Sequence, residues 1–105
     1  MPRRVGIPKK FTLVNRVWTV RFMTKLEMVG EFVDDEGACR PETAEIILRP
    51  NPNRVFLEHS FWHEYFHALA ISVSFDDLNA DEERIESMSG AHHQFMQTRS
   101  GGLVE

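Results

Sequence analysis

Residues 54–73 read RVFLEHSFWHEYFHALAISV, and this stretch decides which fold the rest of the chain can adopt. Its apolar side chains recur every three and four residues, which is the spacing of one helix face: Phe61, Trp62, Tyr65, Phe66, Leu69 and Val73. Asn51-Pro52-Asn53 precedes the stretch, and Asn caps helices well, whereas Pro cannot continue a strand. We therefore predict a long buried helix from Arg54 to about Val73.

The chain before this helix has the alternating pattern of β-strands. From Phe11 to Val33 the pattern is strand-like, and Trp18, Val20 and Phe22 alternate with Thr19 and Arg21, as a sheet with one buried face requires. Asp34-Asp35-Glu36-Gly37 is a turn signal, and the apolar run from Ala44 to Leu48 follows, with Ile46-Ile47-Leu48 as the last strand. The economical interpretation is a hairpin or meander of antiparallel strands.

A second helix is predicted after residues 74–78, which break the helical pattern. Asn79 and Glu82, three residues apart, match a capping box, and the helix runs from there to about Gln97. Its predicted apolar side consists of Ile85, Met88, Phe95 and Met96. The predicted fold class is α+β: a small antiparallel sheet packed on a two-helix hairpin.

Length and composition fit one ordinary domain. The chain has 105 residues, of which 42% are hydrophobic, so we expect a single domain over 1–105 with flexible ends at 1–10 and 98–105. Cys39 is the one cysteine, which excludes an internal disulfide. No apolar run approaches the roughly 18 to 20 residues that span a bilayer, and none follows Met1-Pro2-Arg3-Arg4. We expect a cytoplasmic protein without a membrane partner.

The charge is distributed unevenly along the chain. Residues 1–53 carry nine Lys and Arg against seven Asp and Glu, a net +2, while residues 54–105 carry three against nine, a net −6. Nucleic-acid binders normally present a basic face. Here the basic clusters are Arg3-Arg4 and Lys9-Lys10, so the pattern argues against a nucleic-acid partner.

The predicted long helix contains His63-Glu64-Tyr65-Phe66-His67, an H-E-x-x-H motif. Two His four residues apart lie on one helix face, so both imidazoles can reach one Zn²⁺ at about 2.0–2.1 Å. Glu64 points beside that face, where its carboxylate can take a proton from zinc-bound water, whose pKa the metal lowers to about 7. The motif predicts one Zn²⁺ per chain and hydrolysis of a peptide bond in a protein or peptide substrate.

A third protein ligand is needed if one position is to stay open for water. The acidic cluster at 81–86 supplies the candidates, and Glu82 is favoured because it lies nearest the apolar direction of its helix. Glu86 is the alternative ligand, or it orients one of the metal ligands through a hydrogen bond without contacting the metal. Glu83 points away, and a solvated acidic first turn is the alternative for the whole cluster.

Three further histidines belong to the same two predicted helices. His59 lies four residues before His63, and we interpret it as a surface residue, with a role behind a metal ligand as the alternative. His92 and His93 are candidates for donating a hydrogen bond to the oxyanion that develops during hydrolysis.

The chain resembles a minimal zincin-type metallopeptidase of the small kind encoded in phages and prophages, distantly similar to the gluzincins. The resemblance covers roughly Ala44 to Gln97, and Trp62-His63-Glu64-Tyr65-Phe66-His67-Ala68-Leu69 is its specific part. It implies strands before the H-E-x-x-H helix and a Glu ligand on a second helix. His63 and His67 then match the metal ligands, Glu64 the base, and Glu82 or a neighbour the third ligand. Residues 71–74 lack the Gly and His of a metzincin extension.

Two other functions compete with this hypothesis. In the first, zinc holds a small regulatory or adaptor domain together and hydrolysis is lost or vestigial. In the second, the basic N-terminal arm serves nucleic-acid binding or phage assembly. The sequence leaves the substrate and the oligomeric state open.

Overall fold

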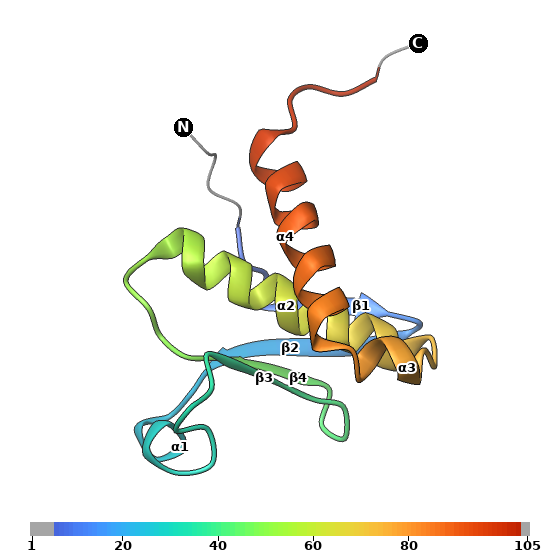
Figure 1. Ribbon diagram of the computed structural model, residues 1–105. Helices are drawn as coiled ribbons and strands as arrows, with labels where there is room; N and C mark the ends of the chain where they lie inside the picture. The colour runs from blue at the N-terminus through green and yellow to red at the C-terminus, as the bar shows by residue number, and fades with distance from the viewer. Residues whose placement is uncertain (1–5, 104–105) are drawn as a thin grey trace.

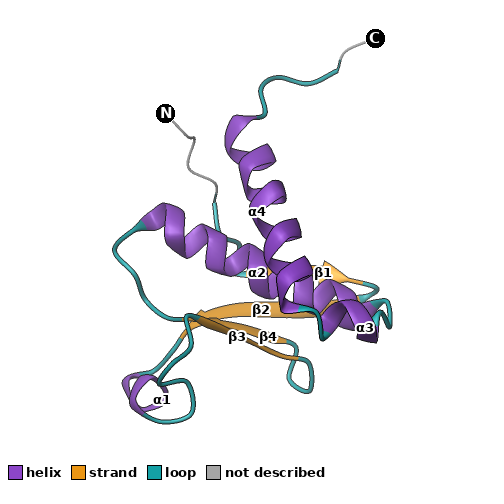
Figure 2. Ribbon diagram, viewed as in Figure 1, coloured by secondary structure: helices purple, strands orange, loops and turns teal. Residues whose placement is uncertain are grey.

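A computed structural model describes residues 6–103 of the chain. The elements in order are β1 (Lys10–Leu13), β2 (Arg16–Phe22), α1 (Lys25–Val29), β3 (Gly37–Arg40), β4 (Glu45–Leu48), α2 (Arg54–Ser72), α3 (Asp76–Asn79) and α4 (Glu82–Thr98). Figure 1 shows α2 lying across one face of the sheet and α4 crossing α2, while α1 lies at the opposite side of the molecule. Figure 2 shows helices and strands in separate layers. The predicted α+β class is confirmed.

The sheet is mixed, whereas the sequence predicted antiparallel pairing. The strand order is β1-β2-β4-β3, and the β1–β2 and β3–β4 pairs are antiparallel. The central β2–β4 pair is parallel, with Thr19 opposite Glu45. The reason is the long connection at 23–36, which leads from β2 to the edge position of β3 and leaves space for one strand between them. A tight hairpin at 41–44 then returns β4 into that place, running in the same direction as β2.

The connection at 23–36 contains α1, so the strand pattern predicted up to Val33 ends earlier, at Phe22. Thr24 and Glu27 cap α1 through a full capping box. Met23 and Phe32 are buried against Ile47 on the face of the sheet opposite α2. This segment therefore covers part of the second sheet face, and residues 34–36 lie at its end, just before β3.

The main core lies between the sheet and α2. Trp18, Ile46 and Leu48 project from the strands and pack against the buried α2 residues Leu57, Phe61 and Ala68. Each large side chain buried in this way contributes about 1.5–3 kcal/mol to folding. The side chain of Asn53 accepts a hydrogen bond from the Phe56 N–H at 3.1 Å and caps α2, as the sequence predicts. The core fixes α2 on the sheet and thereby the direction of every side chain on its other faces.

The second long helix begins later than its predicted cap. Asn79 is the last residue of α3, and Asp81 caps α4 by accepting from the Arg84 N–H at 3.1 Å. Ile85 is buried as predicted, but the other buried residues of α4 are Ser89 and His93, so the packed side is rotated from the predicted apolar side. Phe95, predicted to pack, is 61% exposed. Ser89 and His93 meet polar groups of α2, the Trp62 carbonyl and the Glu58 carboxylate.

The ends of the chain were expected to be flexible over 1–10 and 98–105. Lys10 pairs with Thr19 in β1, and the Lys9 carbonyl accepts a hydrogen bond from the Val20 N–H at 2.9 Å. Residues 1–5, which include the basic pair Arg3-Arg4, and residues 104–105 lie outside the described part of the chain. Within residues 6–103, no helix has the length and apolar character needed to cross a bilayer.

Candidate metal centre

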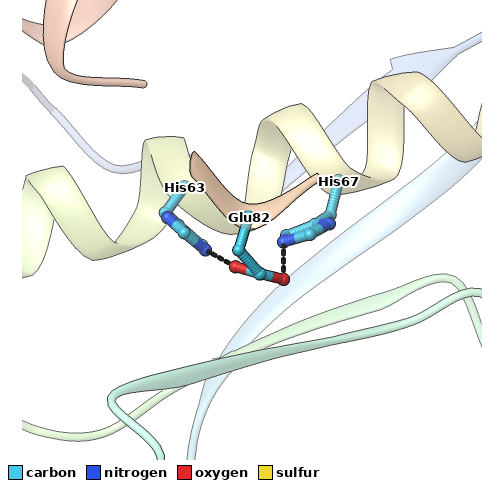
Figure 3. Close-up of side chains that lie close together, drawn as sticks. All are labelled: His63, His67 and Glu82. Carbon is cyan, nitrogen blue, oxygen red and sulfur yellow. Dashed lines mark hydrogen bonds and ion pairs between the residues drawn. The ribbon is translucent and has the colours of Figure 1, made fainter. Parts of the chain in front are cut away.

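His63 and His67 lie one turn apart on α2 and face the first turn of α4. Their ring centroids are 5.1 Å apart. The Nε2 atom of His63 lies 3.0 Å from one oxygen of Glu82, and the Nε2 atom of His67 lies 2.9 Å from the other. Figure 3 shows the two imidazoles converging on this single carboxylate. The structure thus brings together the three residues that the sequence proposed as ligands.

This group can hold a metal ion. One ligand atom from each of the three residues lies within 4.8 Å of the others. Two imidazole nitrogens and one carboxylate oxygen are a donor set found in zinc sites that keep an open position. Imidazole nitrogens suit zinc, copper, iron and nickel, so this donor set fits a transition-metal ion.

Both imidazoles are held from behind through Nδ1. The His67 Nδ1–H donates to the side-chain oxygen of Asn79 at 2.9 Å, and the His63 Nδ1–H donates to Glu86 at 2.5 Å. A proton on Nδ1 leaves the Nε2 lone pair free to bind metal. The sequence proposed this role for Glu86 as an alternative and missed it for Asn79, whose spacing from Glu82 resembled a helix cap.

Acidic neighbours raise the proton affinity of His63. Burial alone would lower its pKa, but the charge of Glu64 and the hydrogen bonds from Glu86 and Glu82 outweigh burial and raise the pKa above its ordinary value. The same negative charges attract a divalent cation to this place, and a metal ion that binds Nε2 would displace a proton from it.

Glu64 lies beside the His pair and faces strand β3. It is 9% exposed, and burial is the main cause that raises its pKa to about 7, with the charges of Glu82 and Asp35 adding to the rise. The charges of His63 and His67 act in the opposite direction. A carboxyl group with such a pKa both takes up and releases a proton readily at neutral pH.

Gly37 makes room for the Glu64 side chain. A Cβ atom at position 37 would stand 3.0 Å from Glu64 Cγ and 3.2 Å from Glu64 Oε2, closer than side-chain contacts normally allow. Sequence reasoning assigned Gly37 only to a turn. Its place at the start of an edge strand opposite the motif helix becomes visible only in three dimensions.

His63, His67 and Glu82 line a cleft of about 550 Å³ between α2, the first turns of α4 and the segment that leads into β3. The cleft is lined by residues 34–38, Phe56, His59, Ser60, His63, Glu64, His67, Glu82 and Glu86. The Nε2 atom of His59 lies 2.5 Å from a carboxylate oxygen of Glu86. His59 therefore belongs to the wall of the cleft through the same carboxylate that holds His63.

The remaining candidates lie elsewhere. His92 packs its ring against Trp62 with 4.3 Å between centroids, and burial lowers its pKa. The His93 Nε2 atom lies 3.0 Å from Glu58 in a buried contact between α4 and α2. Neither His92, His93 nor Glu83 lines the cleft. The structure therefore gives no support to His92 or His93 as oxyanion donors.

No protein-family model matches this chain, and no curated protein and no solved structure matches it either. The function has to be inferred from the site.

Proposed function

We propose that this protein is a zinc-dependent peptidase in which His63, His67 and Glu82 bind the metal and Glu64 acts as the general base. The observation that carries the proposal is the convergence of two Nε2 atoms on one carboxylate in the cleft that also holds Glu64. Three protein ligands are the number found in catalytic zinc sites, where the fourth position is left for water or substrate.

When bound, zinc would acidify a water molecule and polarise the carbonyl of the peptide bond. The chain supplies the remaining steps. Glu64 accepts a proton from the attacking water, the water oxygen bonds to the carbonyl carbon, and Glu64 returns the proton to the amine as the C–N bond breaks. Its pKa of about 7 suits both transfers. Asn79 and Glu86 keep the imidazoles in position.

A peptide substrate is supported by the edge of the sheet. Strand β3 is the last strand in the sheet order, and Gly37 and Ala38 line the cleft. The free backbone groups of an edge strand can pair with an extended peptide, which would then lie next to Glu64.

The test compares the unmodified protein with Glu64→Gln. We expect both to bind about one Zn²⁺ per chain. Glu64→Gln should lose hydrolysis of a peptide that the unmodified protein cleaves, because the amide cannot accept the proton. Glu83→Gln, on the same acidic stretch but outside the cleft, is the matched control and should keep activity. Peptidase activity that survives in Glu64→Gln would place the base elsewhere.

A zinc-stapled regulatory or adaptor domain without hydrolysis is the second candidate. It is favoured by the position of the three residues, because they join α2 to α4, and α4 packs mainly on α2 and α3. A metal ion here would stabilise the placement of α4 whether or not chemistry follows. Peptide cleavage that acetohydroxamate inhibits supports the peptidase, whereas zinc that raises the unfolding midpoint without any cleavage supports the adaptor domain.

A further inference from the structure

The wall of the cleft opposite the His pair is acidic. It is formed by Asp34, Asp35 and Glu36, which precede β3, and the cleft also contains the carboxylates of Glu64, Glu82 and Glu86. No Lys or Arg from the described part of the chain lines this cleft. Glu82 and Glu86 contact His63, so the charge that needs an explanation is that of Glu64 and residues 34–36.

This acidic segment is held in place through its backbone. The Arg49 guanidinium donates to the carbonyl oxygens of Asp35 at 2.8 Å, Phe32 at 2.6 Å and Val33 at 3.0 Å. The Arg49 N–H donates to the Glu36 carbonyl at 2.9 Å. The nearby cation is thus engaged by carbonyl groups. Within residues 6–103, the carboxylates at 34–36 have no hydrogen bond or ion pair, which leaves three negative groups on a fixed backbone.

Glu64 gives an independent indication of where a ligand would lie. Its side chain is about nine-tenths buried, lines the cleft, and has no hydrogen-bond partner among the residues that the structure describes. Since a Cβ at Gly37 would stand 3.2 Å from Glu64 Oε2, the acidic segment enters β3 directly beside this carboxylate. A group bound by residues 34–36 would therefore lie close to the bond that Glu64 helps to cleave.

An aromatic ring also lines the cleft. Phe56 lines the same cleft from α2 and is 40% exposed, although it is a large apolar side chain. A flat ring in the same cleft as carboxylates suits a long side chain with an alkyl stem and a positive end, because the stem can pack on the ring while the charge meets the carboxylates. Lys and Arg have this build, and a bare metal ion would make no use of the ring.

We infer that the cleft selects peptide substrates with a Lys or Arg side chain next to the scissile bond, held by Asp34, Asp35, Glu36 and Phe56. This inference rests on the proposed function for the cleavage step and adds the substrate class. Recognition itself does not need cleavage, and it can be measured separately.

The experiment uses the zinc-loaded Glu64→Gln protein, which should bind peptides without cutting them. Two fluorescein-labelled peptides of Gly, Ala and Ser are compared by anisotropy, and they differ only in a central Arg or its neutral analogue citrulline. We expect the Arg peptide to bind about 10-fold more tightly at low salt, with the difference shrinking as salt is added. Adding Asp34→Asn, Asp35→Asn and Glu36→Gln together should remove the difference.

The matched control removes three negative charges elsewhere, through Asp76→Asn, Asp77→Asn and Glu83→Gln. These residues lie outside the cleft, so the preference for Arg should remain. Equal binding of the two peptides, or an equal loss of preference in the control, overturns the inference. Cleavage by the unmodified protein without preference for Arg overturns the inference and leaves the proposed function standing. Preference for Arg without any cleavage overturns the proposed function and leaves the recognition of Arg standing.

Discussion

Two groups of His and Glu residues join α2 to α4, and they differ in their surroundings. Glu58 and His93 form a contact whose side chains are 0% and 5% exposed, with Arg54 3.5 Å from the other Glu58 oxygen. At the other end, Glu82 faces His63 and His67 while its own side chain is 69% exposed. The same residue types therefore form a closed contact at one end and an open one at the other.

The comparison shows that surroundings decide what a His–Glu contact does. A carboxylate removed from water needs partners that remain in place, because an unpaired buried charge is costly. The buried contact therefore works as a joint between helices. At the open end one carboxylate serves two imidazole nitrogens and water reaches it, so an ion can enter and replace the hydrogen bonds.

The largest expected effect is on metal binding by the open end, His63, His67 and Glu82. His63→Ala with His67→Ala should abolish zinc binding, because two of the three nitrogen and oxygen donors are removed. Metal content after dialysis, measured by mass spectrometry, checks this. His92→Ala serves as the control, since His92 packs on Trp62 away from the cleft. Zinc retained by the double variant would contradict the assignment.

The next effect is on stability and concerns the buried Glu58–His93 contact. Glu58→Ala should lower the free energy of unfolding by about 1–3 kcal/mol, because it leaves the buried His93 Nε2 without this hydrogen-bond partner. Glu82→Ala, measured the same way by urea unfolding in the presence of a chelator, should cost at most about 1 kcal/mol, as expected for an exposed ion pair. A larger loss from Glu82→Ala would mean that the open end also holds the fold together.

A ranking of single carboxylates sharpens the comparison within the open end. Zinc affinity, measured by competition with a chromogenic chelator, should fall most in Glu82→Ala and by about 10 to 100-fold in Glu86→Ala. Glu83→Ala should leave it unchanged, because Glu83 does not line the cleft. If Glu86→Ala loses more affinity than Glu82→Ala, Glu86 is the ligand and the cleft closes differently around the metal.

The smallest expected effect concerns Asn79. Asn79→Ala removes the acceptor that holds His67 Nδ1 and should weaken zinc binding by about 10-fold. Asn79→Asp keeps an acceptor oxygen at the same place, and its affinity should stay at or above that of the unmodified protein. Equal affinity in all three proteins would show that the ring of His67 is positioned by packing alone.

The sequence was most informative where local patterns determine structure. The 3.6-residue period and the Asn53 cap predicted α2 to within one residue of its end at Ser72. The four-residue spacing of His63 and His67 then placed both on one face, because a helix has fixed geometry. Glu82 was favoured from the direction of its helix face, and it is the carboxylate that the structure places between the two imidazoles.

The features that were missed depend on contacts between distant segments. The parallel pairing of β2 with β4 follows from where the chain returns after 23–36, and no alternation of residues records that. Asn79 looked like a cap because its spacing from Glu82 fits one, yet α3 occupies 76–79 and leaves capping to Asp81. The acidic residues 34–36 indicated a turn, and only the folded chain places them opposite the His pair.

The buried Glu58–His93 contact has a mechanical consequence for α4. This helix packs mainly on α2 and α3, and Figure 1 shows its last part extending away from the sheet. Near its C-terminal end, α4 is held to α2 by the buried His93–Glu58 contact. At its first turn, Glu82 contacts His63 and His67, the residues that a metal ion would hold. Because Ile85 and Ser89 are also buried between these two ends, the packing of α4 on α2 sets how far Glu82 stands from the two histidines.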